Sequence, residues 1–240
     1  MSRGNHSYIY FNKAICPHND KRHAQIKVAF TAMCIIILIF SMIRAIFVAE
    51  ILNKLQKALQ DFEGQRAAPV EKWNPPFCGD LDIVIKRNGD WHYMGSPIGR
   101  KPLVQLFSSV LRKEEDGKTY LVTPVEKVGI EVEDSHFLGV EMRVEGTGER
   151  QVLSLRTQTD EWIKLGLDHY LWFESQEKGD LIPYCHMRGR LTCRLNRSVY
   201  YQLMELGQVH IVDGSDWFGI FSQGVFFKMM LQDELDELSK

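Results

Sequence analysis

The sequence predicts an α+β fold of two related units, each with antiparallel strands around one helix, preceded by an N-terminal helix. Three observations lead to this prediction. Asn88-Gly89 and Asp116-Gly117 are two-residue hairpin signals between apolar segments. Two short amphipathic segments, near residues 100 and 196, each follow a helix-start signal. Residues 98–122 also lie without a gap over residues 195–219, and their identities fall at a cap, a core face, a turn and a strand.

The composition indicates a globular protein and argues against some functions. The chain has 240 residues, of which 45% are hydrophobic and 25% are charged, as in globular proteins. The net charge of −2 argues against general nucleic-acid binding. The 5 cysteines are odd in number and form no CxxC motif. They therefore argue against a disulfide-stabilised fold and favour a protein of a reducing compartment.

The N-terminal part allows two interpretations. Residues 28–49 are apolar apart from Arg44, and with that residue they are long enough for a single membrane anchor. The basic residues before this segment would stay cytoplasmic, which places the globular part outside. Alternatively, translation starts near Met42, the preceding residues are an artefact, and the protein is cytoplasmic. A signal peptide is less favoured, because no small-residue cleavage site follows.

Changes in pattern divide the chain into six segments. They are a disordered or artefactual extension (1–27), the apolar segment (28–49), an amphipathic helix with a Pro-rich linker (50–76), a first α+β unit (77–135), a second α+β unit (136–230) and an acidic helical tail (231–240).

In the first unit, a hairpin with its turn at Asn88-Gly89 precedes a helix. Gly99 is the expected N-cap of this helix and Pro102 lies in its first turn. Its buried face is predicted to contain Leu103, Leu106, Phe107, Val110 and Leu111. Strands are then expected at 119–123 and 128–132, after the Asp116-Gly117 turn.

In the second unit, strands are expected at 137–144, 151–157, 184–188 and 191–195, whereas residues 160–173 give no clear pattern. A helix is predicted from an Asn196 N-cap to Gly207 at its C-terminal end. Three strands separated by turns follow, the first turn being Asp213-Gly214.

The stretch GSPIGRKPLVQLFSSVLRKEEDGKTYLVTPVEKVGIEVED, at residues 95–134, resembles the signature region of the bacterial DUF1285 family. The resemblance covers about residues 73–229, and the GSPI and LVTPVEK pieces are specific to it. It implies two related α+β domains, the second superficially like a pleckstrin-homology fold. It also implies a ligand site between the domains, for a nucleotide-like molecule in signalling, and no established activity. The apolar N-terminal segment is not typical of the family.

A polar cluster around the same stretch is the candidate ligand site. Its residues are Ser96, Arg100, Lys101, Thr123, Glu126, Lys127 and Arg197. An arginine at a helix start binds a carboxylate or phosphate well, aided by the N–H groups of the first turn. The structural alternative is that Glu126 pairs with Arg100 or Arg197 and bridges the two units.

Other residue groups give weaker candidates. Trp91, Tyr93 and Trp217 are candidates for stacking on a ligand ring, although aromatic residues at this spacing are more often core. Arg188, Arg190, Arg194 and Arg197 form either a phosphate site or a solvated hairpin face near acidic partners. Cys185, His186 and Cys193 do not form a metal site, because adjacent strand residues point to opposite faces. Gly117-Lys118-Thr119 imitates the end of a P-loop, but the required upstream glycine is Arg112.

The leading hypothesis is a non-enzymatic ligand-binding or signalling module, with a small anionic or nucleotide-like molecule between the two units. No cofactor, metal or catalytic residue is predicted. One alternative is an enzyme that uses Glu126 or one of His92, His136 and His169 as an acid–base group. The other is a structural or interaction protein tethered to the membrane through residues 28–49. The sequence does not predict the oligomeric state.

Overall fold

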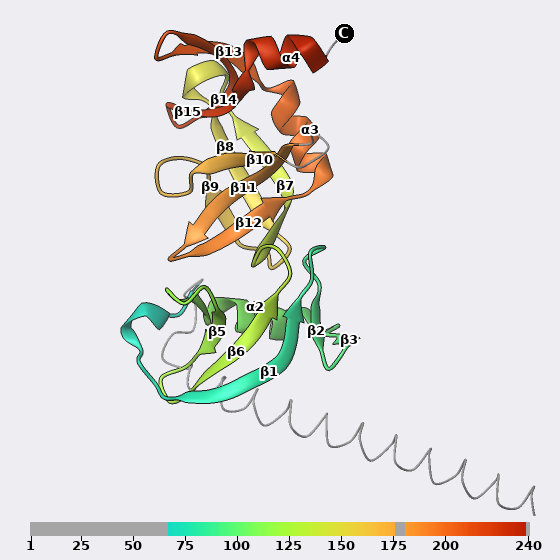
Figure 1. Cartoon of the computed structure of the whole chain (residues 1–240), viewed down its shortest axis with the longest axis vertical. Coiled ribbons are helices and arrows are strands. Elements are labelled where there is room, and N and C mark those ends of the chain that lie inside the picture. The colour runs from blue at the N-terminus through green and yellow to red at the C-terminus, as the bar shows by residue number, and fades with distance from the viewer. Residues whose placement is uncertain (1–66, 176–180, 239–240) are drawn as a thin grey trace, which may run out of the picture. The chain divides into compact units, whose positions relative to one another are not determined.

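The computed structural model describes residues 67–175 and 181–238, which all belong to one compact unit. Within it we distinguish an N-terminal lobe, up to residue 135, and a C-terminal lobe from residue 136 (Figure 1). The extension 1–27, the apolar segment 28–49 and the helix predicted after it lie outside the described residues. Across the described part of the chain, no helix is both long and apolar enough to cross a membrane.

The N-terminal lobe is a six-stranded sheet with one helix across a face (Figure 1). Its elements are the 3-10 helix η2 (Val70–Lys72), β1 (Phe77–Ile85), β2 (Trp91–Tyr93), β3 (Ser96–Pro97), α2 (Lys101–Ser109), β4 (Leu111–Lys113), β5 (Thr119–Val122) and β6 (Lys127–Val132). The strand order is β3-β2-β1-β6-β5-β4.

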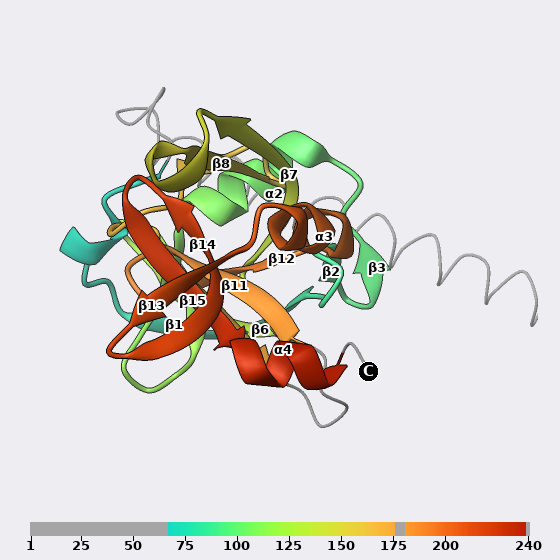
Figure 2. The same ribbon diagram turned by 90° about the horizontal axis from the view of Figure 1, so that it is seen from above.

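The C-terminal lobe combines a six-stranded sheet with a three-stranded one. Its elements are β7 (Phe137–Glu145), the 3-10 helix η3 (Gly148–Arg150), β8 (Val152–Thr157), β9 (Trp162–Lys164), β10 (Leu171–Ser175), β11 (Leu181–Arg188), β12 (Leu191–Leu195), α3 (Arg197–Glu205), β13 (Gln208–Val212), β14 (Ser215–Ser222), β15 (Val225–Leu231) and α4 (Gln232–Leu238). The strand orders are β10-β11-β12-β7-β8-β9 and β13-β14-β15. The helix α3 packs against β7 (Figure 2).

Both six-stranded sheets have the same topology. In each, the first three strands are added outward from the centre, and the next three return from the opposite edge to the centre. The sixth strand therefore lies parallel to the first, β6 beside β1 and β12 beside β7. The predicted duplication is confirmed, with β1–β6 equivalent to β7–β12.

Two details of the predicted units are corrected. The sheets are mixed rather than antiparallel, because the sixth strand of each lies parallel to the first. No turn signal in the sequence specifies a pairing between strands so far apart. In addition, the overlay of 98–122 on 195–219 matches α2 and the β4–β5 hairpin with α3 and the β13–β14 hairpin. That second hairpin belongs to the three-stranded sheet, so this overlay is not the structural repeat.

The helix α2 forms the core of the N-terminal lobe with the sheet. Leu103 and Phe107 are buried on it, and the Phe107 ring stacks on Trp91 at a centroid distance of 6.0 Å. Pro102 lies in the first turn as predicted, where its missing N–H costs no helix hydrogen bond. The N-cap is Arg100 rather than Gly99, and its side chain makes no capping hydrogen bond.

The helix α3 begins and ends where the sequence predicts. The Asn196 side chain accepts a hydrogen bond from the Val199 backbone N–H at 2.8 Å, as an N-cap does. The C-cap is Leu206, and Gly207 follows it. The Phe218 ring occupies the space that a Cβ at position 207 would need, so only glycine fits there.

Residues 160–173, which show no clear sequence pattern, contain β9 and the start of β10. The three-stranded sheet is fixed to the larger one through buried polar groups. Gln151 Nε2 donates to the Phe221 carbonyl at 2.8 Å, and Leu153 N donates to Ser222 Oγ at 2.9 Å.

Candidate functional site

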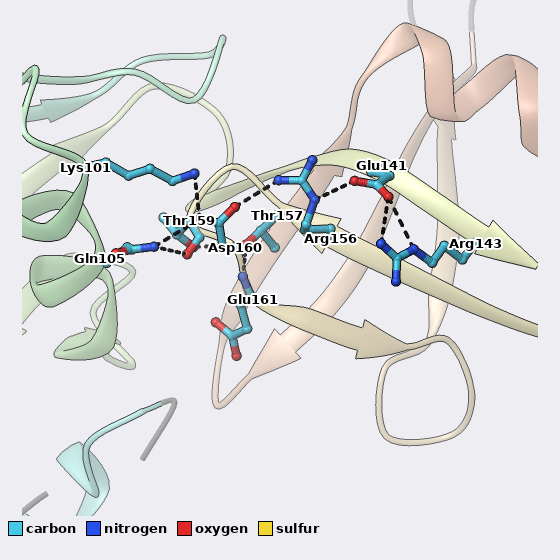
Figure 3. Close-up of polar contacts among 9 residues, drawn as sticks. All are labelled: Lys101, Gln105, Glu141, Arg143, Arg156, Thr157, Thr159, Asp160 and Glu161. Carbon is cyan, nitrogen blue, oxygen red and sulfur yellow. Dashed lines mark hydrogen bonds and ion pairs between the residues drawn. The ribbon is translucent and has the colours of Figure 1, made fainter. Parts of the chain in front are cut away.

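Side chains of α2 bind the turn between β8 and β9 and so connect the two lobes (Figure 3). Lys101 Nζ lies 2.6 Å from Asp160 Oδ2, and Gln105 Nε2 donates to the Thr159 carbonyl at 3.1 Å. Asp160 also accepts from Arg156 Nη1 at 2.9 Å. Lys101 first, and then Arg156, lower the pKa of Asp160. Lys101, a candidate ligand-binding residue, therefore holds the lobes together.

The other end of α2 is also fixed to the C-terminal lobe. Arg188 Nη2 donates to the Ser108 carbonyl at 2.7 Å, and Arg188 Nη1 lies 2.8 Å from Glu161 Oε2. The same guanidinium group lies over the Phe137 ring, 5.1 Å from its centroid. Both ends of α2 are thus tied to the sheet of the other lobe.

The linker between β6 and β7 is fixed through Asp134. Its Oδ1 accepts from the Tyr184 hydroxyl at 2.8 Å, and its Oδ2 lies 2.9 Å from Arg194 Nη1. Burial, together with this hydrogen bond, raises the pKa of Tyr184 to about 12. The phenol is therefore neutral at pH 7 and donates a hydrogen bond to the Asp134 side chain.

A cleft of about 470 Å³ lies where this linker meets the sheet of the N-terminal lobe. We call it the junction cleft. Its walls come from β1, from the β4–β5 hairpin, from β6 and from the linker. The polar side chains that line it are Asp80, Lys113, Lys118, Thr119, Glu131, Asp134 and His136.

The most deeply buried polar pair in this cleft is Thr119 with His136. They are 5% and 2% exposed, and Thr119 Oγ1 lies 3.0 Å from His136 Nε2. Burial, and secondarily the Lys113 charge, lowers the pKa of His136 to about 3, so the ring is neutral at pH 7. Its Nδ1 accepts from the Thr192 backbone N–H at 3.2 Å, which leaves the single ring proton on Nε2. Thr119 therefore accepts from His136, and its own hydroxyl proton is available to a molecule in the cleft.

Charged side chains surround this pair. Lys113 and Lys118 come from the β4–β5 hairpin, and neither forms an ion pair within residues 67–175 and 181–238. Asp80 and Glu131 carry negative charge on β1 and β6. Gly129 gives the Asp80 carboxylate its room, because that group occupies the place of a Cβ. The junction cleft thus offers cationic donors, one hydroxyl donor and carboxylate acceptors.

The LVTPVEK piece of the predicted site forms a structural turn. Thr123 is 4% exposed, and its Oγ1 accepts from the Glu126 backbone N–H at 3.0 Å. Lys127 Nζ lies 2.8 Å from Glu114 Oε2 and 4.6 Å from the centroid of the Tyr120 ring. Lys127 is the first cause of the lowered pKa of Glu114. The Thr123 contact holds the turn between β5 and β6 closed, and the Lys127 contact ties β6 to the β4–β5 hairpin.

The other members of the predicted cluster lie at separate places. Ser96 and Arg100 are exposed, on β3 and at the N-cap of α2. Arg197 Nε donates to the Tyr201 hydroxyl at 2.8 Å. Among the described residues, Glu126 forms an ion pair with neither Arg100 nor Arg197, so the bridge considered from the sequence is absent there.

The aromatic candidates differ in burial. Trp91 is 2% exposed and belongs to the core, so its ring has almost no surface on which a ligand could stack. Tyr93 lies on β2 and Trp217 on β14, both half-buried, with Lys228 Nζ 5.0 Å from the centroid of the Trp217 ring.

Most of the basic cluster is paired with acidic side chains. The pairs are Arg188 with Glu161, Arg190 with Glu115 and Arg194 with Asp134. These pairs agree with the alternative in which the basic residues form a solvated hairpin face near acidic partners, rather than a phosphate site. In the part of the chain that the structure covers, no group of three or more ligating side chains is placed to hold a metal ion.

The junction cleft was missed by sequence reasoning, although two of its segments were noticed. Gly117-Lys118-Thr119 stood out as an incomplete P-loop, and His136 was one of several acid–base candidates. These two segments come together because β5 pairs with β6, and the linker that carries His136 follows β6 directly. No local pattern signals that contact.

Family models match both lobes. Residues 68–135 match the N-terminal domain of the domain-of-unknown-function family DUF1285, and residues 136–229 match its C-terminal domain. The comparison with curated proteins finds no match.

Two solved structures are similar. A DUF1285 family protein from Silicibacter pomeroyi DSS-3 shares 43% identity and a TM-score of 0.67, covering 72% of this chain and 93% of that one. A DUF1285 family protein from Shewanella baltica OS155 shares 26% identity and a TM-score of 0.41, covering 52% of this chain and 91% of that one.

Proposed function

The chain belongs to the DUF1285 family, and we propose from its own geometry that it is a non-enzymatic module that binds a phosphorylated sugar or nucleotide in the junction cleft. The observation that carries the proposal is the buried Thr119–His136 pair beside two lysines without carboxylate partners among the described residues.

The cationic side of the cleft suits a phosphate group. Lys113 and Lys118 supply positive charge, and phosphate oxygens accept hydrogen bonds from ammonium groups. The Thr119 hydroxyl adds a donor whose orientation is restricted, because its oxygen already accepts from His136. Such preorganisation lowers the entropic cost of binding.

The acidic side of the cleft suits hydroxyl groups. Asp80 and Glu131 are acceptors, and carboxylates commonly bind ribose hydroxyls in nucleotide sites. They also disfavour an anion without donors, such as a simple diacid. The volume of about 470 Å³ lies within the range of small-molecule sites.

Binding is favoured over acid–base catalysis by the state of His136. A general base works best when its pKa lies near the working pH, whereas the pKa of His136 is about 3. Both ring nitrogens already have partners in Thr119 and Thr192. The imidazole thus acts as a fixed hydrogen-bond donor.

Calorimetric titration of the full chain with AMP, ribose 5-phosphate and adenosine tests the proposal. We expect both phosphates to bind, and adenosine to bind at least about tenfold more weakly because it lacks the phosphate. The double variant K113A/K118A should weaken AMP binding by at least about tenfold. Lys164→Ala, which removes an exposed lysine outside the cleft, is the matched control. No binding of either phosphate, or unchanged affinity in the double variant, would refute the proposal.

A further inference from the structure

A second cleft of about 380 Å³ lies beside α3 in the C-terminal lobe. We call it the α3 cleft. One wall is apolar and comes from Leu181, Ile182 and Pro183 of β11. Leu195 and the arginine and tyrosine side chains of β12 and α3 form the rest, and no carboxylate is among its described lining residues. Its chemistry therefore differs from that of the junction cleft.

Arg197 carries the positive charge of this cleft. Its Nε donates to the Tyr201 hydroxyl at 2.8 Å, and its guanidinium lies over the Tyr201 ring, 5.5 Å from the centroid. Among the described residues no carboxylate pairs with Arg197, whereas Arg194 in the same cleft is held by Asp134 at 2.9 Å. The Arg197 charge is thus available to a ligand.

We infer that the α3 cleft binds an amphiphilic organic anion, with an acidic group on Arg197 and an apolar body against β11. A guanidinium group binds carboxylates and phosphates through two parallel hydrogen bonds, and its contact with Tyr201 restricts its orientation. The Tyr201 ring is 50% exposed, which leaves apolar surface for the ligand body to cover.

The ligand class differs from that of the junction cleft for an electrostatic reason. Asp80 and Glu131 line the junction cleft and favour a molecule with many hydroxyl donors. The α3 cleft offers hydrocarbon and phenol surface in their place, so a polar sugar phosphate would lose hydration there without gaining acceptors.

Titration of the full chain with 2-naphthoate, followed by calorimetry, tests this inference. We expect binding, with the neutral 2-naphthylmethanol at least about tenfold weaker, and a loss of at least about tenfold in Arg197→Gln. Arg197→Lys keeps the charge and should retain part of the affinity. Arg143→Gln is the matched control, because Arg143 is an exposed arginine that lies 4.1 Å over the Trp162 ring on the same lobe.

The variants also locate the site. Binding of 2-naphthoate should persist in K113A/K118A, which alters only the junction cleft. The inference is overturned if 2-naphthoate does not bind, if Arg197→Gln binds as tightly as the native chain, or if binding is lost in K113A/K118A or in Arg143→Gln.

Discussion

His136 shows how burial decides the chemistry of a single residue. The ring is 2% exposed, and its lowered pKa of about 3 makes it a hydrogen-bond donor rather than a titrating base near neutral pH. From the sequence it was one of three histidines considered for acid–base work. Its position directly before β7 is visible in the sequence, but its burial depends on Thr119 and Thr192, which lie on strands of two different sheets.

The first prediction concerns pH. The folded state keeps His136 neutral down to about pH 3, whereas the unfolded state takes up a proton below its ordinary pKa of 6.5. The unfolded state therefore binds more protons in this window, and the free energy of unfolding should decrease as pH falls from 6.5, by at most about 1.4 kcal/mol per pH unit.

Urea unfolding between pH 6.5 and 5 measures this slope. The range avoids the carboxyl groups with lowered pKa, such as Glu114 and Asp160, whose stabilising contribution is lost only at lower pH. His136→Gln keeps a donor and an acceptor without titrating here, so its stability should depend less on pH. Equal slopes in the two proteins would contradict a buried neutral His136.

A second prediction concerns Thr119. Thr119→Val should lower the free energy of unfolding by about 1–3 kcal/mol, because His136 Nε2–H would be buried without an acceptor. Thr119→Ser keeps the hydroxyl and should lose clearly less. Chemical denaturation at pH 7 measures both, and a loss in Thr119→Ser as large as that in Thr119→Val would contradict a stabilising role for this hydrogen bond.

At the scale of elements, local signals were read reliably and long-range pairings were not. The Asn196 cap, the Asp116-Gly117 turn and the burial of Leu103 and Phe107 on α2 depend on neighbouring residues, so the sequence shows them directly. Of the other residues predicted for that face, Leu106 is half-buried and Leu111 lies on β4. The parallel pairs β1–β6 and β7–β12 depend on strands far apart in the chain, and no turn residue specifies them. The candidate cluster is dispersed for the same reason, since Ser96 to Lys127 are close in sequence but lie on different elements, and Arg197 lies on α3 of the other lobe.

The third prediction concerns the turn between β8 and β9. Asp160 has a φ of +65° and binds Lys101 and Arg156 (Figure 3). Asp160→Asn tolerates that backbone conformation but removes the charge, and should cost about 0.5–1 kcal/mol because the pairs are partly exposed. Asp160→Ala should cost more, since it adds backbone strain.

Thermal unfolding at low and high salt separates these contributions. The difference between the native chain and Asp160→Asn should shrink at high salt, because screening weakens exposed ion pairs. A double-mutant cycle with Lys101→Met isolates the contact between the lobes. A coupling energy of zero at low salt would show that this pair does not help to hold α2 in place.

At the scale of the whole molecule, Asp134 is common to both clefts. Its side chain lines the junction cleft, and its carboxylate holds Arg194, which lines the α3 cleft. One half-buried charge therefore opposes an anion in the first cleft and neutralises a cation in the second. We expect its removal to affect both sites in the same direction.

The fourth prediction follows from this shared charge. Asp134→Asn should lower the free energy of unfolding by about 1–3 kcal/mol, because it loses the Arg194 ion pair. It should nevertheless strengthen binding of both AMP and 2-naphthoate by at least about twofold. Calorimetry on the folded variant measures both affinities, with Asp168→Asn, outside the two clefts, as the control. Weaker binding of both anions would contradict the electrostatic role given to Asp134.

The central claim, that the junction cleft holds a phosphorylated sugar or nucleotide, is tested most directly by a crystal structure of the full chain grown with AMP. We predict density for the phosphate group beside Lys113, Lys118 and the Thr119 hydroxyl, with the ribose toward Asp80 and Glu131. An empty junction cleft at saturating AMP, or AMP bound elsewhere on the molecule, would contradict it.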